Sequence, residues 1–258
     1  MSELEGRVAL ITGVGRRQAI GFAIARRLAA MGADLFVHAF TPYNRAAPWG
    51  GDPDEGAGIL KELRATGRRV EHAEVDLADP EAPARLVAAA AAAFGHVDVL
   101  IANHTHSVHQ PFLELDADEV DRHLTVNVRA TLLLASAFAR QHDGRPGGRV
   151  VMLTSGQHLG PMGVEVAYAA SKGALHQITW TLSDLLIDRG ITVNTINPGP
   201  TDTGWATPDV HERVLRQFPL GRWGQPEDAA RLIAWLCTDD AQWVTGQVIN
   251  SEGGFRRG

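Results

Sequence analysis

The chain has 258 residues, a formal net charge of −6, an apolar content of 45% and a single cysteine. This length suits one large α/β domain covering residues 1–258, and the negative charge argues against a nucleic-acid surface or an anionic membrane as partner. Because Cys237 is alone, an internal disulfide is excluded, and its apolar neighbours predict a buried structural thiol rather than a catalytic one.

The N-terminal segment carries no basic region followed by a long apolar run, so no signal peptide is expected. No segment approaches the roughly 20 consecutive apolar residues that a membrane span needs. We therefore expect a cytoplasmic protein.

Short apolar and β-branched runs alternate along the chain with helical patterns. The runs that predict strands lie at 7–13, 34–40, 68–79, 97–104, 148–156, 191–199 and 246–254. The helical patterns lie at 20–33, 55–67, 80–95, 116–141, 167–188 and 226–238. This alternation, with strands that are continuously apolar, predicts an α/β doubly wound parallel sheet (a Rossmann fold) of about seven strands with helices on both faces.

One connection stands out by its length. Residues 41–56 form a Gly- and Pro-rich segment after the second predicted strand. Loops of this length are unusual inside a compact domain, so we expect this one to cover part of a ligand.

The first predicted strand leads through a glycine-rich loop, "TGVGRRQAIG" (12–21), into a helix. Glycines at such a place permit a tight turn and let a pyrophosphate approach the backbone at the positive end of the helix. The sequence therefore predicts a dinucleotide site at Gly13, Gly15 and Gly21, with Ile20 at the helix start.

Tyr168 and Lys172 lie four residues apart in a helical run of alanines, so they share one edge of that helix. On its own, the pair could be a half-buried tyrosine beside a solvated lysine. However, ligands of doubly wound sheets bind beyond the carboxyl ends of the strands, and Ser155 stands at such an end. A hydroxyl, a phenol and an ammonium thus meet beside the predicted cofactor, which favours a catalytic site.

A series of motifs in a fixed order now gives a resemblance. They are "TGVGRRQAIG" (12–21), "VDL" (75–77), "VDVLIAN" (97–103), "VNVRAT" (126–131), "LTSG" (153–156), "YAASK" (168–172), "NPGPTDT" (197–203) and "TGQVINSEGG" (245–254). The chain resembles the short-chain dehydrogenase/reductase family over nearly its whole length, and within it the 3-oxoacyl-carrier-protein reductases. Ser155 precedes Tyr168 by 13 residues, as the family spacing requires.

The resemblance implies roles for four residues. Tyr168 would protonate the carbonyl oxygen during reduction, while Lys172 would lower the pKa of the phenol and hold the nicotinamide ribose. Ser155 would hydrogen-bond the substrate oxygen. Asn127 would support a water and proton relay behind the lysine, although by itself it could equally be a polar helix residue packed internally.

The resemblance also assigns cofactor and substrate contacts. The cofactor residues, besides the glycine loop with Arg16 and Arg17 and the pair Tyr168 and Lys172, would be Asp76, Leu77, Asn103, Pro198, Gly199, Thr201 and Thr203. The substrate residues would be His104, Gln157, His158 and Trp205. Where the family shows Asn-Asn-Ala-Gly, this chain has Ala102-Asn103-His104-Thr105, a bulkier turn beside the active site.

The run "HTHSVHQ" places His104, His106 and His109 close together in sequence. No nearby carboxylate or cysteine in the sequence completes a ligand set for a metal. We therefore expect no metal site and assign these histidines to the mouth of the substrate site.

The cofactor preference is predicted from the end of the second strand. An acid there would bind the ribose 2′-hydroxyl of NAD, but residues 39–41 contain none, and Asp34 lies at the strand's start. Arg16 and Arg17 could pair with a 2′-phosphate, although they could also simply face solvent. The glycine loop is two residues longer than usual, as in enoyl reductases that often prefer NADH. On balance NADP(H) is favoured over NAD(H).

The combined prediction is an NADP(H)-dependent ketoreductase or alcohol dehydrogenase that transfers hydride between nicotinamide and a carbonyl or secondary alcohol carbon, with a 3-oxoacyl thioester or related ketone as substrate. Two alternatives stay open: an enoyl reductase of the same superfamily, and a dinucleotide-binding regulatory protein without turnover. A homotetramer is expected through the helices at 118–141 and 167–188 and the C-terminal strand.

Overall fold

The computed structural model describes residues 3–47, 50, 52 and 54–257. The other positions of the long segment 41–56 lie outside the described residues. Seven strands form one parallel sheet in the order β3-β2-β1-β4-β5-β6-β7. They are β1 (Val8–Ile11), β2 (Asp34–Ala39), β3 (Val70–Glu74), β4 (Val99–Ala102), β5 (Gly148–Leu153), β6 (Ile191–Asn197) and β7 (Val248–Asn250). The predicted doubly wound sheet is confirmed.

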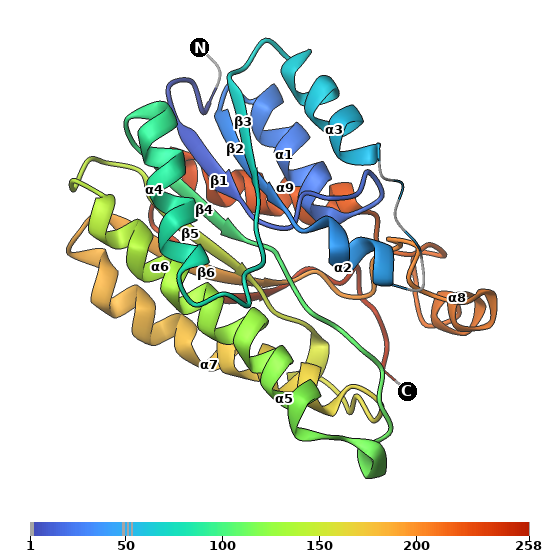
Figure 1. The fold of residues 1–258 in the computed structure, drawn as a ribbon. Coiled ribbons are helices and arrows are strands. Elements are labelled where there is room, and N and C mark those ends of the chain that lie inside the picture. The colour runs from blue at the N-terminus through green and yellow to red at the C-terminus, as the bar shows by residue number, and fades with distance from the viewer. Residues whose placement is uncertain (1–2, 48–49, 51, 53, 258) are drawn as a thin grey trace.

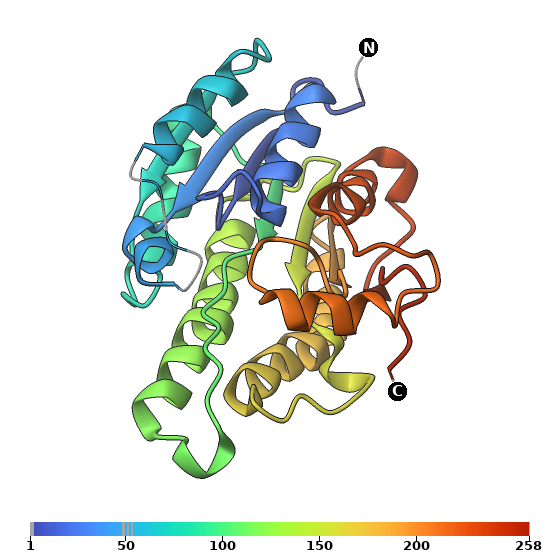
Figure 2. The same ribbon diagram turned by 90° about the vertical axis from the view of Figure 1, so that its right-hand side faces the viewer.

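Helices cover both faces of the sheet (Figures 1 and 2). On one face, α1 (Ile20–Ala30), α3 (Glu55–Arg64) and α9 (Pro226–Leu236) pack their apolar sides on the strands. On the other face lie α4 (Ala82–Phe94), α6 (Ala130–Gln141) and α7 (Val166–Ile187). The central strands β1, β4, β5 and β6 are buried throughout, which explains their uninterrupted apolar runs.

The predicted helix at 116–141 is interrupted near its first third. It begins as α5 (Ala117–His123), continues through the π-helical turn η2 (Leu124–Arg129), and resumes as α6. Such turns are rare and often occur at functional sites. Here the turn carries Asn127, whose exposed fraction is 0%.

The structure adds elements that the sequence patterns did not predict. The segment after β2 contains the helix α2 (Thr41–Ala46), and α8 (Pro208–Leu215) follows the predicted cofactor residues at 198–203. The 3.6-residue periodicity of a helix is hard to recognise in helices of six and eight residues. Single turns η1 (Phe112–Glu114), η3 (Gly156–His158) and η4 (Asp239–Ala241) complete the chain. Within the described part, no helix has the length and apolar content needed to cross a membrane.

Candidate active site

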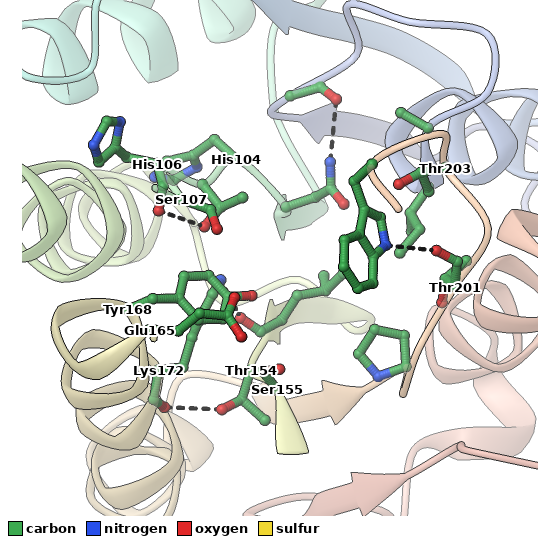
Figure 3. A pocket seen from close by; sticks show the side chains of 18 of the residues that line it. His104, His106, Ser107, Thr154, Ser155, Glu165, Tyr168, Lys172, Thr201 and Thr203 are labelled. Carbon is green, nitrogen blue, oxygen red and sulfur yellow. Dashed lines mark hydrogen bonds between the residues drawn. The ribbon is translucent and has the colours of Figure 1, made fainter. Parts of the chain in front are cut away.

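A cavity of about 930 Å³ opens at the carboxyl edge of the sheet. Because the chain turns to opposite sides after β1 and β4, a crevice forms between their ends, the usual ligand position in this architecture. The glycine loop, Asp76, Tyr168 and Trp205 all line the cavity, and Tyr168, Lys172 and Ser155 lie together on one side (Figure 3). It is continuous and large enough for a cofactor and a small substrate together.

The glycine loop is packed so closely that side chains would not fit. Gly13 has a positive φ of 75°, and a Cβ atom there would lie 2.8 Å from Asn103 Nδ2. A Cβ at Gly21 would lie 2.3 Å from the carbonyl oxygen of Gly13. No side chain caps the start of α1, where Ala19 and Ile20 line the cavity. The loop and helix start therefore form the cradle that a pyrophosphate requires.

The two arginines of the loop point in different directions. Arg16 lines the cavity, and its Nη2 donates a hydrogen bond of 2.8 Å to the carbonyl of Thr203 across the crevice. Arg17 turns away from the cavity; its Nε lies 3.5 Å from Glu62, and its backbone N–H donates to Glu55. Of these two arginines, only Arg16 lines the cavity.

Two carboxylates that the sequence analysis did not place there lie near the end of β2. Ala39 and Phe40 line the cavity and residues 39–41 hold no acid, but the Glu74 carboxylate accepts a hydrogen bond of 3.1 Å from the Thr41 N–H. Glu55, through the Arg17 backbone, is a second carboxylate in this region. Both come from other elements, so the local sequence around β2 gave no sign of them.

The predicted cofactor residues Asp76 and Leu77 line the cavity, as does His38 of β2, which the sequence analysis missed. His38 is buried, its Nε2 lies 3.0 Å from the carbonyl of Val75, and burial lowers its pKa. Its Nδ1 can then accept the 3.4 Å hydrogen bond from the Gly13 N–H. A neutral histidine thus supports the glycine loop from the neighbouring strand.

Asn103 and His104 after β4 brace the same loop. Asn103 Nδ2 donates to the carbonyls of Thr12 and Gly13 at 2.9 and 3.2 Å. His104 lies between Thr12 Oγ1 at 2.7 Å and the carbonyl of Val126 at 3.0 Å. Burial, and to a smaller extent the neighbouring His38 and Lys172, lowers the pKa of His104 to about 3, so this ring is neutral near pH 7. The bulkier turn is accommodated by hydrogen bonds on both ring nitrogens.

Tyr168 and Lys172 come together on the inner edge of α7, as predicted (Figure 3). Lys172 Nζ lies 5.6 Å from the centre of the Tyr168 ring and donates a 2.9 Å hydrogen bond to the carbonyl of Leu153. Thr154 Oγ1 donates to the carbonyl of Lys172 at 2.8 Å. These bonds tie the helix to the end of β5, where Ser155 also lines the cavity.

The electrostatics of this pair differ from the expectation. Burial lowers the pKa of Lys172 to about 7, and burial raises the pKa of Tyr168. The negative charge of Glu165 also raises the pKa of Tyr168, while a hydrogen bond with Ser155 lowers it. The expected lowering of the Tyr168 pKa by Lys172 is therefore wrong for this site, because both groups are removed from water and the lysine itself holds its proton less firmly.

Asn127 is held by a two-pronged contact with one peptide segment. Its Oδ1 accepts from the His106 N–H at 2.7 Å, and its Nδ2 donates to the His106 carbonyl and to Ser171 Oγ, both at 2.9 Å. The π-helical turn aims the carboxamide away from the helix backbone and towards this segment. The four predicted catalytic residues are therefore gathered at one end of the cavity or directly behind it.

Comparison with known proteins agrees with this arrangement. The family model described as "Enoyl-(Acyl carrier protein) reductase" matches residues 13–256. The chain is 42% identical to a Bacillus subtilis (strain 168) protein, "Uncharacterized oxidoreductase YjdA", over 100% of both chains. The protein is a short-chain dehydrogenase/reductase.

Solved structures of this family superpose closely on it. A short-chain dehydrogenase from Burkholderia cenocepacia J2315 in complex with NADP is 34% identical, with a TM-score of 0.87 and 98% of each chain covered. A 7α-hydroxysteroid dehydrogenase complexed with NADH and 7-oxo glycochenodeoxycholic acid is 26% identical, with a TM-score of 0.88 and 99% and 96% covered. As a family member, the protein is an NAD(P)-dependent oxidoreductase acting on CH–OH and C=O groups.

The histidines of the dehydrogenase's 104–109 segment do not form one cluster. His104 faces Thr12, while His109 Nε2 lies 3.3 Å from Glu165. His106 Nε2 lies 2.5 Å from Glu119, a carboxylate that the sequence analysis did not place there. The three histidines are held apart because each has a different partner: Thr12 for His104, Glu119 for His106 and Glu165 for His109.

His106, Glu119 and His123 do converge, with one potential ligand atom of each within 4.8 Å of the others. However, His123 Nε2 accepts a hydrogen bond from the Val108 N–H at 3.4 Å, which leaves the proton on Nδ1. That Nδ1 faces the Glu119 carbonyl at 2.9 Å and its carboxylate at 3.1 Å. Hydrogen bonding among the three side chains therefore accounts for the cluster, and the absence of a metal site stays a prediction.

The predicted substrate residues divide into two groups. His104 and Trp205 line the cavity, and Trp205 Nε1 donates to the carbonyl of Thr201 at 3.1 Å. Gln157 instead turns back to the Ser155 N–H at 3.2 Å, and the His158 ring packs on His176 with centroids 4.6 Å apart. Neither Gln157 nor His158 belongs to the residues that line the cavity.

The remaining predicted cofactor residues Pro198, Gly199, Thr201 and Thr203 all line the cavity. Sequence reasoning missed further lining residues, among them Tyr43, Met162, Glu165 and Phe255. Glu165 could have been found, because it lies three residues before Tyr168 at the start of the same helix. Phe255 could not, since it reaches the cavity only through the path of the C-terminal segment.

Proposed function

We propose that this enzyme is an NADP(H)-dependent ketoreductase or alcohol dehydrogenase that transfers hydride between nicotinamide and a carbonyl or secondary alcohol carbon. One observation carries the proposal: Ser155, Tyr168 and Lys172 line the same end of a cavity whose other end is a glycine cradle. The substrate, a 3-oxoacyl thioester or a related ketone, would occupy the space between Tyr168 and Trp205.

The residues present fit a dinucleotide. Glycines at 13 and 21 let the loop turn tightly against Asn103 and the start of α1, where a pyrophosphate would bind, and Asp76 and Leu77 line the cavity as residues for the adenine. The bound nicotinamide supplies or accepts the hydride, which no side chain can do. Pro198, Gly199 and Thr201 border the end of the cavity nearest the catalytic residues.

The chain's own residues perform the proton chemistry. In reduction, Ser155 donates a hydrogen bond to the substrate carbonyl oxygen, and Tyr168 transfers its phenolic proton to that oxygen as the carbon is reduced. Lys172 faces the Tyr168 ring, and in its charged form it stabilises the phenolate that results. Asn127 fixes the segment at His106 that forms the wall beside them.

An enoyl reductase is the second candidate, favoured by the description of the matching family model and by the lengthened glycine loop. The four-residue spacing of Tyr168 and Lys172 favours carbonyl reduction instead. NADPH oxidation with a panel of ketones, enones and 3-oxoacyl thioesters separates the two. Turnover of enones with a saturated ketone as the only product would contradict the ketoreductase.

For the cofactor we propose a preference for NADP(H), based on Arg16 in the cavity wall and on the lack of an acid at residues 39–41. Binding of NADPH and NADH is titrated for the wild type, Arg16→Ala and Arg17→Ala. If Arg16 binds the 2′-phosphate, Arg16→Ala weakens NADPH binding about tenfold or more and leaves NADH binding unchanged.

Because Arg17 points to Glu62, Arg17→Ala serves as the matched control with little effect. An equal loss of both cofactors in Arg16→Ala would instead assign this arginine to the pyrophosphate. A wild-type preference for NADH that neither substitution changes would contradict the proposed specificity.

We also propose a homotetramer. Apolar side chains are exposed on η2 and α6 and along α7, namely Leu124, Leu132, Trp180, Leu185 and Ile187. Large apolar side chains that face solvent on adjacent helices are typical of subunit interfaces. Light scattering at micromolar concentration should give four times the chain mass, and a monomer would contradict the proposal.

A further inference from the structure

Glu165 lines the cavity but has no role in the proposed proton and hydride transfer. It immediately precedes α7, lines the cavity and stands three residues before Tyr168 (Figure 3). Three residues correspond to roughly 5 Å along a helix axis. Both side chains line the cavity, and the charge of Glu165 acts on the Tyr168 phenol.

The Glu165 carboxylate is only half satisfied. Its Oε1 lies 3.3 Å from His109 Nε2, and the side chain is 22% exposed. Among the described residues, no hydrogen-bond or ion-pair partner is found for Oε2. One carboxylate oxygen is therefore left to interact with whatever enters the cavity.

The charge of Glu165 works against catalysis when nothing balances it. A negative charge beside the phenol disfavours the phenolate, and Glu165 accordingly raises the pKa of Tyr168. A positive charge bound next to Glu165 would cancel this effect. A cationic substrate would thus restore the acidity that the isolated site lacks.

The surroundings of Glu165 also suit a cation. Trp205 lines the same end of the cavity and packs edge-on against His109, with ring centres 6.4 Å apart. Aromatic rings attract organic cations. Four arginines line the wall: Arg16 donates to the Thr203 carbonyl, Arg257 is paired with both oxygens of Glu252, and Arg122 and Arg213 are solvent-exposed. Among the described residues, none of the four forms an ion pair with Glu165.

We propose that the substrate is an amino ketone, or the corresponding amino alcohol, whose protonated amine binds the free oxygen of Glu165 while its carbonyl faces Tyr168 and Ser155. This rests on the proposed ketoreductase function and specifies its substrate class. Glu165 is then a specificity-determining residue, and it takes no part in proton transfer.

The test uses three six-membered ring ketones of nearly equal shape. 1-Methylpiperidin-4-one carries a cationic N–H opposite the carbonyl, 4-hydroxycyclohexanone carries a neutral donor, and 4-methylcyclohexanone carries none. Their binding to the enzyme–NADP⁺ complex is measured by calorimetry, and their reduction is measured separately with NADPH. A charge-assisted hydrogen bond should make the piperidinone bind about tenfold or more tightly than 4-methylcyclohexanone.

Glu165→Gln should abolish this preference, because the amide keeps the size but not the charge. The same variant should reduce 4-methylcyclohexanone roughly threefold faster, since the proton donor becomes more acidic. Glu227→Gln is the matched control: Glu227 is a carboxylate near the start of another helix, paired with Arg26 outside the cavity. It should keep the wild-type preference.

Several outcomes would overturn the inference. Equal binding of the three ketones, or no binding of the piperidinone, removes the cation site. If 4-hydroxycyclohexanone binds most tightly, the site recognises a neutral hydrogen-bond donor and not a cation. If the preference for the piperidinone survives Glu165→Gln, the cation binds at another residue. If the binding preference holds but none of the ketones is reduced, the proposed ketoreductase function fails while the cation site stands.

Discussion

The cofactor end and the substrate end of the cavity are built in different ways. At the cofactor end, residues follow directly after β1, β2 and β4 and bind one another, as in the bonds from Asn103 to Thr12 and Gly13. At the substrate end, the walls come from connecting segments at 105–111, 156–165 and 199–205. These segments meet one another through contacts such as the Gln110 N–H to the Val164 carbonyl at 2.9 Å and His109 with Glu165 and Trp205.

The difference shows which part of the enzyme sets its chemistry and which sets its substrate. Strand ends have little freedom, so the cradle and the residues around Tyr168 are fixed by the sheet. Connecting segments vary more readily without disturbing a fold. The substrate wall therefore accommodates side chains particular to this protein, such as Glu165 and His109.

The largest effect is expected for Tyr168→Phe. The variant keeps the ring and removes the proton donor, so ketone turnover should fall by roughly 10²- to 10⁴-fold while NADPH binding stays near wild type. The chain has only one other tyrosine, Tyr43, which provides the control. Tyr43→Phe loses a hydrogen bond with Ser107 but no acid, so its loss should stay below about tenfold. Comparable turnover in Tyr168→Phe and the wild type would show that the proton comes from another group.

A smaller effect is expected from Glu119, which holds the His106 side chain at 2.5 Å while Asn127 holds the His106 backbone. Glu119→Ala should lower kcat about tenfold by loosening this segment, with little change in cofactor affinity. Glu119→Gln should restore most of the rate because its amide oxygen still accepts from His106. Steady-state kinetics of both variants, with the exposed Glu114→Ala as control, checks this. If Glu119→Gln is as slow as Glu119→Ala, a hydrogen bond to His106 is not what matters.

The buried lysine predicts a pH-dependent stability. The pKa of Lys172 falls from 10.5 to about 7 on folding, so between these values the unfolded chain binds a proton that the folded protein lacks. Raising the pH through this window should therefore stabilise the folded protein, by at most about 1.4 kcal/mol per pH unit. Lys172→Met should lose this gain. Denaturant unfolding of both proteins at a series of pH values from roughly 7 to 9.5 measures it. Parallel curves for the two proteins would contradict the burial of a titrating lysine.

The smallest effect is expected for His158→Ala. Since His158 packs on His176 outside the cavity lining, kcat/KM for any ketone should change less than about twofold, as for most substitutions away from a site. A tenfold change in kcat/KM with one ketone but not with another would show that His158 contacts the substrate. It would weaken the contrast between the two ends of the cavity.

The sequence alone sufficed for the parts that depend on local pattern. The strands and long helices followed from apolar periodicity, and the pairing of Tyr168 with Lys172 followed from helical spacing. The glycine cradle followed from a strand, a glycine loop and a helix in succession. In each case neighbours in the chain supply most of the determining contacts.

What escaped prediction depends on residues far apart in the chain. Arg17 was expected to face a phosphate, but Glu62, on α3, lies beside it. His106 contacts Glu119 only because α5 folds back along the segment that follows β4. The raised pKa of Tyr168 required knowing how deeply α7 is buried. None of these contacts has a local sequence signature.

The most direct test of the central claim is to follow the hydride itself. Cyclohex-2-enone offers the enzyme both a carbonyl carbon and an enoyl carbon, and NADPH deuterated at both C4 positions labels whichever carbon is reduced. Analysis of the product by mass spectrometry and NMR gives the position of the label. We predict deuterium on the carbinol carbon of the allylic alcohol. Deuterium at the β-carbon of a saturated ketone would contradict carbonyl reduction and assign the site to an enoyl reductase.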